Sequence, residues 1–118
     1  MPHLFPEPTR IPVPGGKVID EIVGAASSQH RTISIAHMNA PAGWTEPFQT
    51  PEFEEYTVVV RGTVTVECDG VVYECHAGQS IVTSAGERIR YGVGPEGAEY
   101  YAICLPAFTP DAVHREEQ

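Results

Sequence analysis

From residue 17 onward the chain is a series of short β-type segments separated by glycine, proline and other turn residues. No segment keeps a helical hydrophobic period over several turns. The expected strands are Val18 to Val23, Thr32 to Met38, Tyr56 to Arg61, Thr63 to Cys68, Val71 to Cys75, Ser80 to Thr83, Ile89 to Val93 and Glu99 to Leu105. This pattern predicts an all-β sandwich or barrel.

The clearest local signal is a hairpin between residues 64 and 75. Its centre is Asp69-Gly70, and this dipeptide suits the positive φ angles of a tight type I′ turn. A two-residue turn places Val66 opposite Tyr73 and Val64 opposite Cys75. These four side chains are therefore expected on one face of the hairpin.

The first sixteen residues contain five prolines and end in Gly15-Gly16. Proline blocks both helix and ladder hydrogen bonds, so residues 1–16 are predicted to form an extended arm. This arm either packs along a barrel edge, crosses to a partner subunit or is a loose tail. The rest of the chain, residues 17–118, has the length of one domain with a single hydrophobic core.

Composition argues against several classes of partner. The chain has a net charge of -9 and no stripe of basic residues, so it is not expected to bind nucleic acid or anionic membranes. It has no apolar run of about 20 residues and no secretory signal pattern. Its three cysteines, Cys68, Cys75 and Cys104, fit free thiols, and we expect a cytoplasmic protein.

The segment from Tyr56 to Val60 differs from the other strands because it is apolar or β-branched at both parities. Such a strand should be covered on both faces. The barrel interior covers one face, and a second subunit is the simplest cover for the other, which predicts a homodimer. The alternative is that the N-terminal arm covers this face within the same chain.

Four glycines and one glutamate have the spacing of a known double motif: Gly43, Gly62, Gly78 and Gly86, with Glu55 seven residues before Gly62. On these residues the chain resembles the RmlC-like cupin superfamily. The resemblance implies a double-stranded β-helix of jelly-roll type, with the functional site inside one mouth of the barrel.

The resemblance also locates the positions that hold a metal in many cupins. The three histidine positions are occupied by Gln49, Pro51 and Ile89, while the glutamate is kept as Glu55. A three-histidine, one-glutamate iron or manganese centre cannot form from these residues. In this the chain is similar to histidine-poor cupins such as the ethanolamine-utilisation cupin protein.

Other inward-facing groups are expected from strand parity. In the segment 33–39 the isoleucines favour the core, which places His37 and Asn39 on the same face. Tyr91 keeps the parity of Ile89, and Glu46 corresponds to a substrate-contacting position in some cupins. Trp44 either walls the pocket or packs at the rim. The expected pocket residues are His37, Asn39, Trp44, Glu46, Gln49, Glu55, Ile89 and Tyr91.

Two kinds of chemistry fit this set. In the first, His37, Glu46 and Glu55 bind a divalent metal such as zinc, nickel or iron. In the second there is no metal, and Glu46 and Glu55 act as general acid and base with assistance from Tyr91 or His37. Two like charges in one pocket raise the pKa of one carboxyl, which suits proton transfer near neutral pH.

The sequence therefore leaves three functions open. The first is a small enzyme that acts on a polar metabolite by lyase or isomerase chemistry. The second is a non-catalytic cupin that binds or senses a small molecule. The third is a metal-dependent cupin enzyme with a non-standard set of histidine and glutamate ligands. The fold alone does not choose among them, because cupins host many chemistries on one barrel.

Overall fold

The computed structural model describes residues 1–117, and nearly all of their regular structure is β-strand. This confirms the predicted all-β jelly-roll barrel. The elements are β1 Thr9–Ile11, β2 Val18–Val23, β3 Ser34–Ala40, β4 Glu54–Cys68, β5 Val71–His76, β6 Ser80–Thr83, β7 Ile89–Leu105 and a short 3-10 helix η1 Pro110–Ala112.

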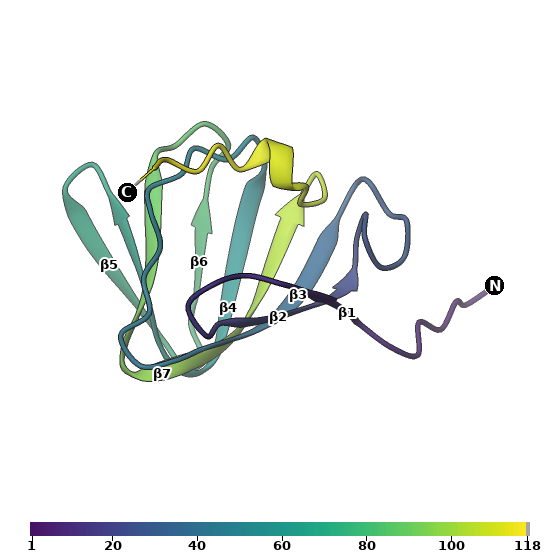
Figure 1. Cartoon of the computed structure of the whole chain (residues 1–118), viewed down its shortest axis with the longest axis horizontal. Helices are drawn as coiled ribbons and strands as arrows, with labels where there is room; N and C mark the ends of the chain where they lie inside the picture. Colours follow the sequence, from purple (N-terminus) through teal and green to yellow (C-terminus); the bar gives the residue numbers. More distant parts are fainter. Residues whose placement is uncertain (118) are drawn as a thin grey trace.

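Strands β4 and β7 are long, and they pair with each other along two separate lengths. Residues 54–59 pair with 100–105, and residues 64–68 pair with 89–93. Between these two lengths Arg61 and Gly62 pair with Glu99 and Ala98, with a shift of register on each side. The strand order is β1-β2-β3-β7-β4-β5, and β6 pairs with β4. The sheet folds over on itself where both long strands bend, as the ribbon shows (Figure 1).

The sequence predicted two strands where β4 runs and two where β7 runs, and in both cases the structure has one bent strand. The break was expected near Gly62, which has a φ of +79°. A glycine with positive φ produces a bulge that bends a strand and still lets pairing continue on each side. All four glycines of the cupin-like motif have positive φ.

The predicted hairpin is confirmed in its turn and its register. Asp69 and Gly70 have φ angles of 50° and 76°, as a type I′ turn requires. Val66 pairs with Tyr73, and Val64 pairs with Cys75. Val64, Val66 and Cys75 are buried, whereas Tyr73 is 49% exposed because it lies on β5, at the end of the strand order.

The N-terminal segment is more ordered than its prolines suggested. Residues 9–11 form β1, which pairs antiparallel with β2, with Ile11 opposite Ile19. The prediction that proline would block ladder bonds is wrong for these residues, because they lie between Pro8 and Pro12 and keep their own N–H groups. The loop between β1 and β2 crosses in front of the barrel, and the chain before β1 extends away from it (Figure 1).

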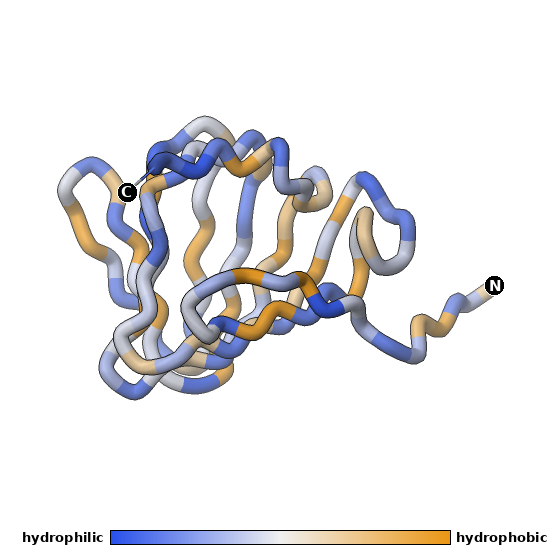
Figure 2. Tube along the Cα trace, in the orientation of Figure 1, coloured by the Kyte–Doolittle hydropathy of each residue, from blue (hydrophilic) through white to orange (hydrophobic). Residues whose placement is uncertain are grey.

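The first part of β7, which pairs with β4 along one edge, contacts irregular segments along its other edge. Thr45 bridges to Gly92 and Gln49 to Ile89, and Gln49 also bridges to Arg115 near the C-terminus. The C-terminal segment therefore lies beside Gln49 at this edge of the barrel. Hydrophobic and hydrophilic residues alternate along many of the strands (Figure 2), and the largest buried cluster draws mainly on β4 and β7.

The outer face of β4 and β6 stays open in this chain. Val58, Val60 and Val82 are 39%, 50% and 49% exposed. The N-terminal segment pairs with β2 instead, so it does not supply the cover that the sequence suggested as an alternative to a second subunit. No helix within residues 1–117 is long and apolar enough to cross a membrane.

The bend at Gly62 leads to a prediction. A Cβ atom at this position would lie 2.1 Å from the carbonyl oxygen of Gly97, and its φ is +79°. We expect Gly62→Ala to lower the free energy of unfolding by about 2 to 4 kcal/mol, from backbone strain plus crowding. Urea denaturation measures this loss.

The matched control is Gly70→Ala in the hairpin turn. Gly70 has a similar φ of +76°, and nothing lies within 4 Å of an added Cβ. Gly70→Ala should lower the free energy of unfolding by about 1 kcal/mol, from backbone strain alone. Equal losses in the two variants would show that the close approach at Gly62 does not matter.

Candidate functional site

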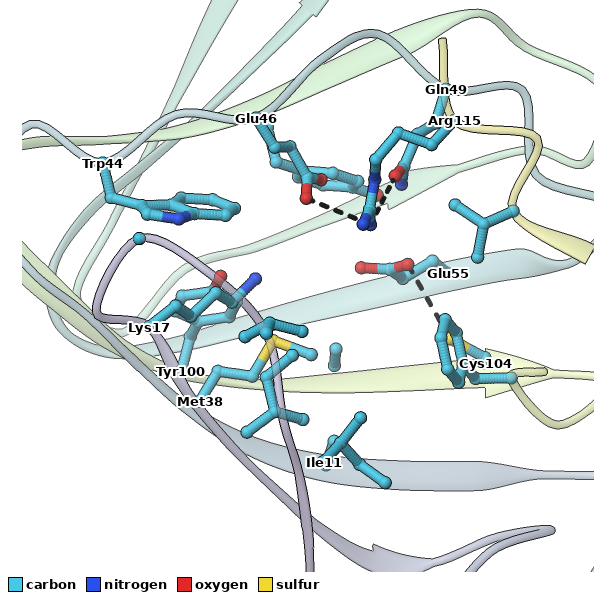
Figure 3. Close-up of a pocket in the computed structure, with 18 of the residues that line it drawn as sticks. Ile11, Lys17, Met38, Trp44, Glu46, Gln49, Glu55, Tyr100, Cys104 and Arg115 are labelled. Atoms are coloured by element: carbon cyan, nitrogen blue, oxygen red, sulfur yellow. Dashed lines mark hydrogen bonds and ion pairs between the residues drawn. The ribbon is translucent and has the colours of Figure 1, made fainter. Parts of the chain in front are cut away.

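A cavity of about 440 Å³ opens at the mouth of the barrel. The β1–β2 loop, strands β1 to β3 and the inner side of β7 line one part, and residues 44–49 with the C-terminal segment line the other (Figure 3). Its apolar walls include Ile11, Val13, Ile19, Met38, Phe53, Phe108 and Val113. Its polar groups include Lys17, Glu46, Gln49, Glu55, Tyr91, Tyr100 and Arg115.

Glu55 is the first carboxyl of the cavity. It stands near the start of β4, and its Oε1 accepts a hydrogen bond of 3.7 Å from the Sγ of Cys104. Burial raises the pKa of the Glu55 carboxyl from 4.5 to about 7, Lys17 opposes the rise, and Glu46 adds to it. Near neutral pH this side chain can therefore both give and take a proton.

Glu46 is the second carboxyl of the cavity, and its side chain is 12% exposed. Burial raises its pKa, while the positive charges of Lys17 and Arg115 act in the opposite direction. The guanidinium of Arg115 lies 3.3 Å from the Glu46 carboxylate and donates to Oε1 of Gln49 at 3.3 Å. The C-terminal segment thus fixes the orientation of two cavity residues.

Lys17 carries the other positive charge of the cavity, from the loop between β1 and β2. Its Nζ lies 4.1 Å from the centre of the Trp44 ring and 5.5 Å from that of Tyr100. Burial lowers the pKa of the Lys17 ammonium group, although Glu46 and Glu55 favour its charged form. The amine, the two rings and the carboxyls face the same space (Figure 3).

Two tyrosines complete the polar lining. The hydroxyl of Tyr91 shares a 2.9 Å hydrogen bond with Thr83, and Tyr100 lies beneath the Lys17 amine. Burial, with the negative charges of Glu55 and Glu46, raises the pKa of both phenols well above 10.0. Both phenols are therefore neutral at physiological pH and act as hydrogen-bond donors or acceptors.

A third buried carboxyl borders the cavity, and its bonds indicate a structural role. Oε2 of Glu21 accepts hydrogen bonds from the backbone N–H groups of Ala26 and Ser27, at 3.0 and 2.8 Å. A carboxylate bonded to two amides of one turn orders that turn. Glu21 thus holds the loop between β2 and β3.

The structure places Trp44, Glu46, Gln49, Glu55 and Tyr91 around the cavity. Ile89 is buried in the main hydrophobic cluster, and it is not among the residues that line the cavity. Its backbone N–H and carbonyl both bond to Gln49, with distances of 2.8 Å. Ile89 therefore supports the cavity wall from behind.

His37 and Asn39 lie on the opposite face of β3, so the parity inferred for this strand is wrong. Ser34, Ala36 and Met38 face the cavity instead. His37 bonds through Nε2 to Glu99 at 2.8 Å, and its ring lies 5.1 Å from that of Tyr101. The isoleucines do not mark the inner face, because this strand carries apolar residues on both faces.

With His37 on the other face, the predicted ligand set of His37, Glu46 and Glu55 is not brought together. Within the described part of the chain, no group of three histidine, cysteine or acidic side chains is placed to hold a metal ion. At the cupin ligand positions only Gln49 and Glu55 reach the cavity, and they supply one amide and one carboxylate. These donors do not fit the metal centre that many cupins carry.

Several residues that line the cavity were not expected from the sequence, and they include Lys17, Tyr100, Cys104 and Arg115. One signal was available for Lys17, because it is the only lysine in the chain. Arg115 could not be found in this way, since it meets Gln49 only when the C-terminal segment folds back across the mouth. Cys104 was expected as a free thiol; it is free and buried, and desolvation raises the pKa of its thiol.

Comparison with known proteins adds an independent line of evidence. A family model described as "Cupin domain" matches residues 36–104, more than half of the chain. A curated protein, endoribonuclease YbeY of Myxococcus xanthus, is 40% identical over 107 residues. The match covers 90% of this chain but only 36% of that protein, so the chain spans about a third of its length.

Among solved structures, a Streptomyces Pac13 variant with uridine has a TM-score of 0.78 and 14% identity, covering 99% of this chain and 90% of that one. Pac13 is described as a unique nucleoside dehydratase. An RmlC-like cupin from Shewanella frigidimarina has a TM-score of 0.73 and 16% identity over 89% of each chain. The Clostridium difficile EutQ protein has a TM-score of 0.61 and 20% identity, covering 80% and 72%. At these identities the likeness concerns the fold.

The raised pKa of Glu55 predicts how stability depends on pH. Its pKa in the folded chain, about 7, exceeds the ordinary value of 4.5, so the folded state binds the extra proton. The free energy of unfolding should therefore fall as pH rises from about 4.5 to about 7, by roughly 3 kcal/mol from this group. Glu55→Gln should remove this fall, as urea denaturation across that range would show.

Glu54→Gln is the matched control, because Glu54 accepts its 2.6 Å hydrogen bond from the hydroxyl of Tyr56 and is not among the residues lining the cavity. This variant keeps Glu55 and should keep the fall in stability. Parallel pH curves for the wild-type chain and Glu55→Gln would contradict a raised pKa at Glu55.

Proposed function

Since the chain belongs to the cupin domain family, we propose that its barrel cavity is the active site of a small enzyme that moves protons on a polar small molecule. The chemistry is that of a lyase or isomerase, with side chains as the acids and bases. The observation that carries this proposal is Glu55, a cavity carboxyl whose pKa of about 7 matches the pH at which it would work.

The surrounding groups have complementary roles in such a reaction. Glu55 takes a proton from carbon or returns it, and Glu46 is the second proton-transfer group, held in place by Arg115 at 3.3 Å. The neutral hydroxyl of Tyr91 donates a hydrogen bond to a substrate oxygen. Trp44 forms an apolar wall against which the rest of the substrate packs.

The solved neighbours suggest which reaction to test first. Pac13 is described as a nucleoside dehydratase, and variants of it were solved with uridine. A dehydratase needs one group that removes a proton from carbon and one that protonates the departing hydroxyl. Two carboxyls with raised pKa in one cavity fit that requirement. Nucleosides and hydroxylated carbonyl compounds are therefore the first candidates.

The experiment is to incubate the protein in D₂O with a panel of nucleosides and hydroxylated carbonyl metabolites. Deuterium uptake at carbon is followed by NMR, and loss of one water by mass spectrometry. The wild-type chain should exchange or dehydrate at least one compound. Glu55→Gln should fold normally and be slower by about 100-fold or more, the usual contribution of a general acid–base group.

Glu54→Gln serves as the control again and should keep the wild-type rate. An active compound that Glu55→Gln turns over equally well would remove Glu55 from the mechanism. Compounds that raise the melting temperature and show neither exchange nor product would instead support a non-catalytic cupin that binds a small molecule.

We also propose that the protein is a cytoplasmic homodimer that pairs through the outer face of β4 and β6. Val58, Val60 and Val82 are exposed there. Tyr101, opposite Val58, and Ile103, opposite Tyr56, extend the face across β7. Removing this apolar surface from water favours association by about 25 cal/mol per Å². The cytoplasmic location is supported by three free cysteines.

Charge on this face should dissociate the dimer. Val58→Glu places a carboxylate opposite Tyr101. We therefore expect the dissociation constant of the dimer to rise at least about tenfold, as sedimentation equilibrium would measure. Val72→Glu is the control, because Val72 is 57% exposed on β5, away from this face. A monomeric wild-type chain would contradict the proposed dimer.

A further inference from the structure

The single lysine of this chain lies in the cavity. Lys17 follows the Gly15-Gly16 turn of the β1–β2 loop and is the only side-chain amine in the sequence, whereas arginine occurs at six other positions. Lysine and arginine differ in one chemical respect that matters here: a neutral lysine amine is a nucleophile, and a guanidinium is not. The position therefore allows covalent chemistry as well as charge.

The immediate surroundings of the Lys17 amine are aromatic. Its Nζ lies 4.1 Å from the Trp44 ring centre and 5.5 Å from that of Tyr100. The neighbouring carboxyls have bonds to other groups, since Glu46 pairs with Arg115 and Glu55 accepts from Cys104. The amine thus faces the cavity with rings beside it (Figure 3), and burial lowers its pKa, which increases the share of the neutral, nucleophilic form.

We propose that Lys17 forms an imine with an aldehyde or ketone that binds in the cavity. The Nζ lone pair attacks the carbonyl carbon, a C–N bond forms, and the carbonyl electron pair moves to oxygen, which takes up a proton. The resulting carbinolamine then loses its hydroxyl as water, with a proton from Glu55, to give a protonated imine. Hydrolysis reverses the sequence, and no oxidant or reductant is involved.

The cavity provides for each stage of this reaction. Glu55 titrates near neutral pH, so it can protonate the departing hydroxyl as the acid and remain as a carboxylate. The rings of Trp44 and Tyr100 stabilise the positive charge of the protonated imine, as they do that of an ammonium group.

The imine also deepens the proposed function, on which this step rests. A protonated imine withdraws electrons from the adjacent carbon and makes its proton easier to remove. The Glu55 carboxylate can then take that proton, and the electron pair moves to the imine nitrogen to form an enamine. The substrate class is accordingly a carbonyl compound with a hydrogen on the carbon next to the carbonyl.

Borohydride trapping tests the imine directly. The protein is incubated at neutral pH with phenylacetaldehyde or glyceraldehyde and sodium cyanoborohydride, and peptide mass mapping locates the reduced adduct. We expect Lys17 of the folded chain to react severalfold faster than the same lysine in the urea-unfolded chain, because burial lowers the pKa of its ammonium group and so raises the share of free amine. The rate should also saturate with aldehyde concentration.

Lys17→Arg is the matched control, since it keeps the positive charge over Trp44 and removes the nucleophile. It leaves no lysine in residues 1–118, so no adduct should map to the β1–β2 loop. Reaction at Lys17 that is no faster than in urea, or that rises linearly with aldehyde, overturns the proposal, and this comparison needs no variant to fold.

The two proposals can fail separately. Turnover that depends on Glu55 without trapping at Lys17 would overturn the imine and leave the acid–base enzyme standing. Rapid, saturable trapping at Lys17 in a chain that exchanges and dehydrates nothing would support the imine and overturn the acid–base enzyme.

Discussion

The barrel depends on the antiparallel pairing of β4 with β7, because β3, β5 and β6 each pair with one of these two strands. Both strands run through two layers, and each bends once so that one pair of strands encloses the core from two sides. The main buried cluster includes Val59, Val64 and Val66 of β4, with Ile89 and Tyr91 of β7. The bend needs a residue with positive φ and no side chain at Gly62, where the backbone of Gly97 is in close contact.

The charges of the cavity come from distant parts of the chain. Glu46 and Glu55 belong to its middle, whereas Lys17 and Arg115 come from segments near its two ends. In a site of low dielectric, such charges determine one another's protonation, because removing an ion from water is costly unless an opposite charge is near. Burial lowers the pKa of the Lys17 amine, which increases the share of its neutral form, and raises that of the Glu55 carboxyl to about 7, where it exchanges protons near neutral pH.

Much of the fold could be predicted from local patterns. The register of the β4–β5 hairpin followed from Asp69-Gly70 because a two-residue turn leaves no freedom in pairing. Glu55 and Gln49 could be placed in the cavity from the spacing of the motif glycines. Strand parity failed on β3, where Ile35 pairs with Ile103 on the outer face while Ala36 and Met38 face the cavity. A strand that is apolar on both faces does not reveal by its pattern which face is inside.

The sequence alone determined the cupin class of the barrel, its tight turns and the residues at the cupin ligand positions, because each depends on residues close together in the chain. Only the tertiary structure decided which charged groups meet in the cavity. Arg115 contacts Gln49 across 66 residues of sequence, and Lys17 reaches Trp44 from a separate loop. Such contacts depend on how the β1–β2 loop and the C-terminal segment cross the barrel mouth. Side-chain packing determines the course of both segments.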